Sequence, residues 1–359
     1  MPSPQPRVNG TRLHAPWFPP YLLTYAIAHS ATIVSPDYRL LPEASGLDIL
    51  SDISSLWSWL FTSLHAYLLL KDPLNTPCGV DLGQIMVSGE SAGGWLAIQS
   101  ALMHPNRIKV ILGIFPMLDL GDEHFTRGGR RNINVNTSCL HDEGAPSCTT
   151  VAKVPTSTPS KLLLRETTDR ASQAKQIVGV GALLDARIID EHIAAAARAR
   201  STHHTGGGGG VISSVTPPAR AELSLALFQH GRLGELLGGE RELYPLEVLE
   251  DKMTMMMRRR CDAAGGGNKT SRFLPPPLCV IHGTDDTVVP VQGSRRFCRA
   301  WEKTWRAQQL CDGRAIGDGG AVVKLVLRPG EHGFEATASE EEDGWLREAL
   351  GWVADRWLS

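Results

Sequence analysis

The stretch Gln84–Trp95, which reads QIMVSGESAGGW, decides the fold. Its first half is a short apolar run that predicts a buried strand, and the residues from Trp95 to Met103 have the pattern of a helix. Between them lies G-E-S-A-G, the G-x-S-x-G arrangement of a nucleophile elbow, in which a tight turn gives the serine strained backbone angles and tolerates only small residues two positions to either side. The turn would place the Ser91 hydroxyl beside the N-terminus of the helix, where negative charge is stabilised. We therefore expect Ser91 to be a nucleophile rather than part of a glycine-rich packing turn.

Apolar runs and helical patterns alternate on both sides of this stretch. The runs are continuous, which is typical of strands that are covered on both faces and hence of a parallel sheet. Further strands are expected at 31–35, 110–114, 278–281 and 322–327, and helices at 48–70, 293–306 and 340–357. The sequence thus predicts an α/β fold.

The alternation stops in the middle of the chain. A polar, turn-rich insertion covers 128–176, helices are expected at 176–200 and 219–237, and Met253–Arg260 is expected to be a loop or a helix end. His203 and His204 precede five glycines, and a solvated linker is favoured over a metal site because no further ligands accompany them. We expect two core segments, 1–120 and 273–359, around an insertion at 121–272.

Length and composition favour one large globular domain with insertions. The 359 residues carry 36 basic and 38 acidic side chains, so the charge does not indicate a nucleic-acid partner. No apolar run reaches the ~18 residues of a membrane span, and the first residues lack the apolar segment of a secretory signal. Seven cysteines without a C-x-x-C pair are typical of reduced thiols in a cytoplasmic protein and do not suggest a zinc site.

A serine nucleophile needs a base and a group that orients the base, and both follow later strands. The run at 278–281 leads into H-G-T-D-D-T-V-V-P, which contains Asp285 and Asp286. The run at 322–327 leads into R-P-G-E-H-G-F, which contains His332. The order Ser, Asp, His along the chain, with each residue after a strand, is typical of α/β-hydrolases.

Together these motifs resemble the hormone-sensitive-lipase-like branch of the α/β-hydrolase superfamily, the fold-3 esterases. That branch has a G-D/E-S-A-G-G elbow, a D-Y-R-L-x-P-E segment (here Asp37–Glu43), an H-G-x-x-D-x-x-V-P acid loop and an H-G-F histidine loop. The resemblance covers 30–120 and 277–358 well and the middle only loosely. It implies an α/β-hydrolase fold with a mostly parallel sheet and a helical cap at 121–272.

Carried over residue by residue, the resemblance makes Ser91 the nucleophile, His332 the general base and Asp286 the acid. Asp285 is then a solvated loop residue, and His282 a structural histidine before the acid loop. Asp119 is interpreted as support for the base of the insertion. Glu90 is expected to bond within the elbow.

The resemblance also shows what is missing. Fold-3 esterases stabilise the oxyanion with an H-G-G-G segment, each donor of such a site being worth about 2.7–4 kcal/mol. Ala92 would supply one backbone donor, but H-G-G-G is absent, although Asn9–Phe18 resembles what normally follows it. Five of the eight expected strands are found, and the strand that would lie between 31–35 and 84–88 is not among them. We therefore expect a sheet that lacks its first strands, in a sequence that begins inside the domain.

The resemblance implies a serine hydrolase of the carboxylesterase or lipase type. It would cleave small or medium acyl esters through an acyl-enzyme, with no metal or organic cofactor. An alternative is a catalytically silent protein that keeps the fold for binding, which the missing H-G-G-G segment motivates. An amidase or peptidase would share the same three residues.

Overall fold

The computed structural model describes residues 18–71, 79–127, 183–202, 212–213, 215, 220–262, 273–311 and 321–359. The insertion at 128–176, the histidine pair with its five glycines, and residues 9–17 of the segment that resembles the end of an oxyanion loop lie outside these ranges. The expectations for those segments stay predictions.

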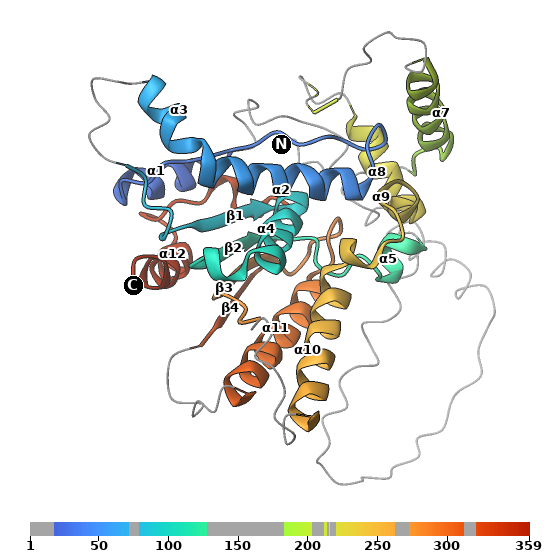
Figure 1. Ribbon diagram of the computed structural model, residues 1–359. Coiled ribbons are helices and arrows are strands. Elements are labelled where there is room, and N and C mark those ends of the chain that lie inside the picture. Colours follow the sequence, from blue (N-terminus) through green and yellow to red (C-terminus); the bar gives the residue numbers. More distant parts are fainter. Residues whose placement is uncertain are drawn as a thin grey trace, which may run out of the picture.

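Four parallel strands form the sheet of the described residues, in the order β1-β2-β3-β4 (Figure 1). Their bounds are β1 Met86–Glu90, β2 Val110–Ile114, β3 Leu278–Gly283 and β4 Val323–Arg328. Gly89 of β1 is paired with Gly113 of β2, and Ile114 of β2 with Ile281 of β3. Every residue of β2 and β3 is buried, as the continuous apolar runs predicted. The expectation of an α/β fold with a parallel sheet is confirmed.

Helices cover both faces of this sheet. Alternate residues of β2 enter different cores because successive side chains of a strand point to opposite faces. Val110, Leu112 and Ile114 pack against α1 (Pro20–Ala28) and α12 (Gly344–Trp357). Ile111 belongs to the larger core that includes side chains of α2 (Gly46–Thr62), α4 (Ser91–Met103) and α11 (Val291–Cys311). The carboxyl ends of the strands therefore emerge from a well-packed, three-layered framework.

The insertion between β2 and β3 contributes five described helices, and α10 runs beside α11 on the larger core (Figure 1). Their bounds are α5 Glu123–Thr126, α7 Arg187–Thr202, α8 Ala221–His230, α9 Leu233–Leu237 and α10 Pro245–Asp262. The remaining elements are α3 Leu64–Lys71 and the 3-10 turns η2 Pro105–Arg107, η5 Arg241–Leu243 and η7 Phe334–Thr337.

The strand expected at 31–35 is not formed. The segment is extended and mostly exposed, and no strand of the described residues pairs with it. A strand needs a hydrogen-bonded neighbour, and β1, the edge of the sheet on this side, is separated from the segment by a cavity that both line. Within the described ranges no strand lies between this segment and β1, and the two are separated by the cavity rather than packed against each other.

Two expected helices are broken, and one segment expected to be a loop or a helix end is helical. The helix expected at 48–70 is broken at Ser63 into α2 and α3, and the one expected at 219–237 is broken at Gly231, which takes a left-handed φ of 63°. Glycine adopts this conformation without strain. Met253–Arg260, expected to be a loop or helix end, lies inside α10.

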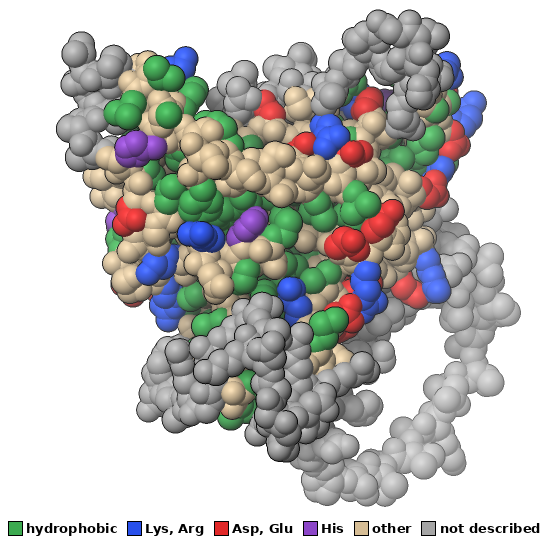
Figure 2. Space-filling view, in the orientation of Figure 1, with side chains coloured by type: hydrophobic (Ala, Val, Ile, Leu, Met, Phe, Trp, Pro, Cys, Tyr) green, Lys and Arg blue, Asp and Glu red, His purple; other side chains and the backbone are tan. Residues whose placement is uncertain are grey.

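Figure 2 shows acidic and basic side chains interspersed over one face of the molecule, without a continuous basic patch on its described part. Among the described helices none alone has the length and hydropathy to cross a membrane. Only α2 and α3 together reach that composition, and they meet at an angle of 65°.

Candidate active site

The junction of β1 and α4 has the geometry of the predicted elbow. Ser91 takes a φ of 49°, a strained value for a residue with a side chain. A Cβ on Gly89 would lie 2.2 Å from the carbonyl oxygen of Gly93, and one on Gly94 would lie 2.5 Å from Pro116 Cβ. The elbow motif also predicted that only a small residue fits at Gly93. This was wrong, because a Cβ there would meet nothing within 4 Å. Gly93 faces the cavity beside β1, so its small size is not required by packing.

Ser91 is the first residue of α4 and is buried. The backbone N–H groups of the first turn of a helix have no partner inside the helix. The N–H of Ala92 is one of these groups, directly after the serine. Negative charge that develops beside Ser91 would therefore be stabilised both by this donor and by the helix dipole.

Asp286 is held by four contacts in the loop after β3. Its Oδ1 accepts from the backbone N–H groups of Val288 and Val289 at 2.9 and 2.8 Å. Its Oδ2 lies 2.7 Å from His332 Nδ1 and 3.3 Å from His282 Nε2. Burial raises the pKa of Asp286, but the charge of His332 and hydrogen bonds from His282 and His332 overcome this effect and leave the pKa below its usual range. The carboxyl is therefore an ionised partner for His332.

The carboxyl of Asp285, the residue before Asp286, does not contact His332. Asp285 is exposed, and its Oδ2 accepts from the backbone N–H of Gly330 at 2.8 Å. The Asp285 N–H in turn donates to the carbonyl of Gly330 at 3.1 Å. Asp285 thus fastens the acid loop to the histidine loop, whereas Asp286 meets the imidazole.

His282 is fully buried in β3, and its Nε2 lies 3.3 Å from Asp286 Oδ2. Its Nε2 lies 2.8 Å from the carbonyl oxygen of Val289, and its Nδ1 lies 2.8 Å from the Ser294 hydroxyl. A carbonyl oxygen only accepts, so Nε2 carries the proton and donates. The residue has the structural place expected for it.

His332 is also buried, and its ring packs against Phe115 with centroids 4.3 Å apart. Phe115 follows β2, and two residues later Met117 N–H donates to the carbonyl of Ser91 at 3.1 Å. This loop therefore contacts both the serine and the histidine. Ser91 Oγ and His332 Nε2 are buried without a hydrogen-bond partner among the described residues, so the serine–histidine bond is not made in this structure. Such bonds are often long without substrate and tighten when it binds.

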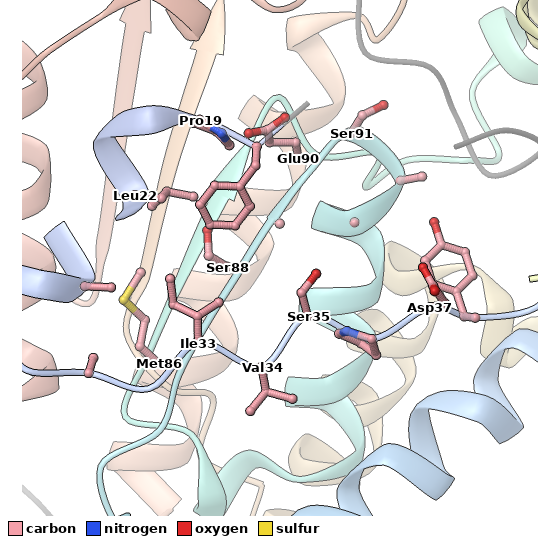
Figure 3. A pocket seen from close by; sticks show the side chains of 18 of the residues that line it. Pro19, Leu22, Ile33, Val34, Ser35, Asp37, Met86, Ser88, Glu90 and Ser91 are labelled. Atoms are coloured by element: carbon pink, nitrogen blue, oxygen red, sulfur yellow. The ribbon is translucent and has the colours of Figure 1, made fainter. Parts of the chain in front are cut away.

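A cavity of about 410 Å³ lies beside the elbow, between β1 and the extended segment that follows α1 (Figure 3). Ser91, Ala92 and Gly93 form one end of it. Ile33, Val34 and Met86 give its walls an apolar character. This volume is in the range of small-molecule sites in proteins.

The D-Y-R-L-L-P-E segment, Asp37–Glu43, forms ion pairs with α2 and with the residue before α8. Arg39 donates to Asp48 Oδ1 at 2.9 Å and to Asp52 at 3.0 Å, both on α2. Glu43 accepts from both terminal nitrogens of Arg220, at 2.8 and 2.7 Å, directly before α8. The segment thus links the core to the insertion.

Asp119 lies at the base of the insertion, as interpreted from the sequence. It forms an ion pair with Arg296 of α11, with 2.6 Å between Arg296 Nε and Asp119 Oδ2. Asp122 binds the same arginine.

Two further carboxyl groups each have an oxygen that is shut off from solvent, and one of them, Glu90, is half-buried and lines the cavity (Figure 3). The expectation that Glu90 bonds within the elbow was wrong for Oε1, which has no hydrogen-bond partner in the ranges that the structure describes. Glu335, three residues after His332, is 1% exposed, and no described residue is a hydrogen-bond partner of its Oε2. Sequence reasoning missed Glu335; the only signal was a carboxyl so close to the histidine motif.

No group of three or more His, Cys, Asp or Glu side chains among the described residues has the arrangement of a metal site. The role of Ala92 as an oxyanion donor stays a prediction from the sequence.

Comparison with known proteins gives a consistent result. The family described as "alpha/beta hydrolase fold" matches residues 14–198. A probable carboxylesterase M8 from Phoma sp. is 28% identical over 351 residues, covering 98% of this chain and 82% of that protein. A probable carboxylesterase clz11 from Cochliobolus lunatus is 47% identical over 89 residues, 24% of this chain and 39% of that protein. The crystal structure of carboxyl esterase 2 from the fungus Tuber melanosporum has a TM-score of 0.41 at 13% identity, covering 94% of this chain and 69% of that one.

Proposed function

The chain belongs to the α/β-hydrolase family, and we propose that it hydrolyses carboxylic esters with Ser91, His332 and Asp286 as a catalytic triad. The observation that carries this proposal is the 2.7 Å bond between His332 Nδ1 and the ionised Asp286. Ser91, which has a strained backbone and begins α4, supports it. The names of two fungal relatives, both probable carboxylesterases, support the ester bond as the target.

The proposed reaction begins when Ser91 Oγ attacks the ester carbonyl and His332 Nε2 takes the hydroxyl proton. Asp286 holds the imidazole with its proton on Nδ1 and stabilises the imidazolium that forms. The N–H of Ala92 donates to the tetrahedral oxyanion. His332 then gives its proton to the departing alkoxide, which leaves an acyl group on Ser91. Water, deprotonated by His332, attacks this acyl-enzyme and releases the acid.

The cavity beside the elbow suggests where a substrate binds. Its volume of about 410 Å³ and its apolar walls suit a small or medium acyl chain that ends at Ser91. The helices at 121–272 would form a cap over the core, which the Arg220–Glu43 ion pair fastens to the segment beside the cavity.

A second candidate function is binding without catalysis. Ser91 Oγ and His332 Nε2 have no hydrogen-bond partner in the described part of the chain, and Ala92 is the one oxyanion donor that the sequence identifies. Loss of a donor typically lowers kcat about 10²–10³-fold, so a protein with this site binds esters and turns them over slowly if its other donor is absent.

Labelling with a fluorophosphonate probe separates the two candidates. We expect the probe to label Ser91, the Ser91→Ala variant to lose the label, and Ser51→Ala, an exposed serine of α2, to keep it. Hydrolysis of p-nitrophenyl esters of increasing acyl length would then define the substrate range. A folded protein that binds these esters but neither reacts with the probe nor releases p-nitrophenol would overturn the esterase proposal.

A further inference from the structure

A second hollow, of about 390 Å³, adjoins the cavity beside the elbow and is not used by the proposed mechanism. Its walls come largely from two helices, and we call it the α2–α4 hollow after them: Ile53, Leu56, Trp57 and Leu60 of α2 and Leu96 and Ala97 of α4. These side chains are all apolar. Asp81, the charged side chain among its described walls, is exposed, so an apolar guest would not bury a charge here.

The α2–α4 hollow continues the cavity beside the elbow. Both are lined by residues of the extended segment, of β1 and of the elbow, among them Thr32, Val34, Met86, Ser88 and Gly93. The cavity reaches α1, on one face of the sheet, whereas the hollow lies against α2 and α4, on the other. In Figure 3 Ile33 and Val34 leave the extended segment in opposite directions. The two spaces thus form one path past β1, an edge strand of the described sheet.

Ser91 lies at the start of this path, because it lines the cavity beside the elbow. Gly93, two residues further on, lines both the cavity and the hollow. A Cβ at Gly93 would meet nothing within 4 Å, so the first turn of α4 leaves the path open at this point. A flexible, unbranched group attached to Ser91 can therefore extend past Gly93 and reach α2.

We propose that the α2–α4 hollow binds the distal part of a long acyl chain, so that esters of long, unbranched carboxylic acids are the preferred substrates. This inference rests on the proposed function of Ser91. The cavity beside the elbow holds the part of the chain next to the ester, and the hollow holds the remainder. An alkyl chain suits these walls because burial of one CH2 group raises affinity about fourfold. Binding of a part of the substrate that does not react increases kcat/KM.

The dependence of kcat/KM on chain length tests the proposal. The substrates are p-nitrophenyl butanoate, octanoate and dodecanoate, each below the concentration at which it aggregates. We expect the wild type to gain at least about tenfold in kcat/KM from octanoate to dodecanoate, since the additional CH2 groups are buried. Leu60→Trp puts a larger side chain into the hollow and should abolish this gain, while kcat/KM for butanoate stays within about twofold. Leu60→Ala enlarges the hollow and should keep the gain.

Two further variants make this test independent of one substitution. Ser58→Trp adds the same indole to an exposed position of α2 and should keep the profile of the wild type. Ala97→Leu fills the hollow from α4 and should abolish the gain for dodecanoate, as Leu60→Trp does. A gain that persists in both Leu60→Trp and Ala97→Leu would contradict the proposal.

Tryptophan fluorescence reports the position of the chain without catalysis. A bromine atom quenches an indole on contact, so 12-bromododecanoate, with bromine at the far end of the chain, should quench Trp57 in the hollow. We expect the quenching to be smaller in Trp57→Phe than in the wild type. With 2-bromododecanoate, whose bromine would lie near Ser91, the two proteins should differ little.

The fluorophosphonate probe separates this inference from the proposed function. If Ser91 is labelled, but Leu60→Trp keeps the profile of the wild type and Trp57→Phe keeps its quenching, the inference is wrong and the proposed function stands. A polypeptide segment that occupies the hollow would give that same result. If Ser91 is not labelled, the proposed function fails, and quenching of Trp57 still decides whether the hollow binds an acyl chain.

Discussion

Asp285 and Asp286 are adjacent in sequence, yet only one of them meets the imidazole. Asp286 Oδ2 lies 2.7 Å from His332 Nδ1, whereas Asp285 Oδ2 accepts from the Gly330 N–H at 2.8 Å. We predict that Asp286→Asn lowers kcat about 10⁴-fold, because an amide stabilises the wrong tautomer of the histidine. Asp285→Asn keeps a carbonyl acceptor for Gly330 and should retain kcat within a few fold. Steady-state kinetics of the two purified variants would check this, and equal losses would contradict the assignment of Asp286.

The glycines of the elbow also differ from one another. A Cβ on Gly89 would lie 2.2 Å from a backbone oxygen, which is less than any tolerated contact, while one on Gly93 would enter open space. We predict that Gly89→Ala lowers the free energy of unfolding by about 1–3 kcal/mol, the usual effect of overpacking. Gly93→Ala should change it by about 0.5–1 kcal/mol in the stabilising direction, since alanine favours a helix over glycine. Urea unfolding measures both, and a comparable loss at Gly93 would contradict the geometry.

At the scale of elements, the Arg220–Glu43 pair links α8 to the segment before α2. The two side chains are 15% and 21% exposed, and two hydrogen bonds join them. We predict a coupling energy of about 1–2 kcal/mol from a double-mutant cycle of Arg220→Ala and Glu43→Ala, followed by urea unfolding. The exposed pair Arg306–Glu302 on α11 is the control and should give less than about 0.5 kcal/mol. Equal values would mean that the Arg220–Glu43 pair does not fasten the insertion.

The elements also show what can be predicted from sequence. The elbow, the acid loop and the histidine loop were found because each depends on a few consecutive residues with special backbone or chemical requirements. The segment at 31–35 has the composition of a strand, but whether it becomes one depends on a partner elsewhere in the chain. Glu335 was missed for a similar reason, since its burial, to 1% exposure, depends on how its turn packs against the rest of the fold. Interactions at long range, rather than local propensity, account for these differences.

At the scale of the whole molecule, the buried carboxyl of Glu335 makes the free energy of unfolding depend on pH in an unusual direction. The pKa of Glu335 is about 7 in the folded protein and 4.5 as its ordinary value, so the folded state binds this proton more tightly. Stability from this group is complete below about pH 4.5 and is lost as pH rises to about 7. The loss amounts to about 3 kcal/mol, since each pKa unit corresponds to about 1.4 kcal/mol.

Other groups change stability in the same range, so the comparison must be made between variants. Burial lowers the pKa of His124, and this histidine therefore stabilises the fold as pH rises through its unfolded value. Asp286, whose pKa is lowered, acts only in more acidic solution. Subtracting the unfolding free energy of Glu335→Gln from that of the wild type at each pH removes both effects. We predict that this difference falls by about 3 kcal/mol between pH 4.5 and pH 7 and is constant above. A difference that does not change with pH would mean that Glu335 titrates normally.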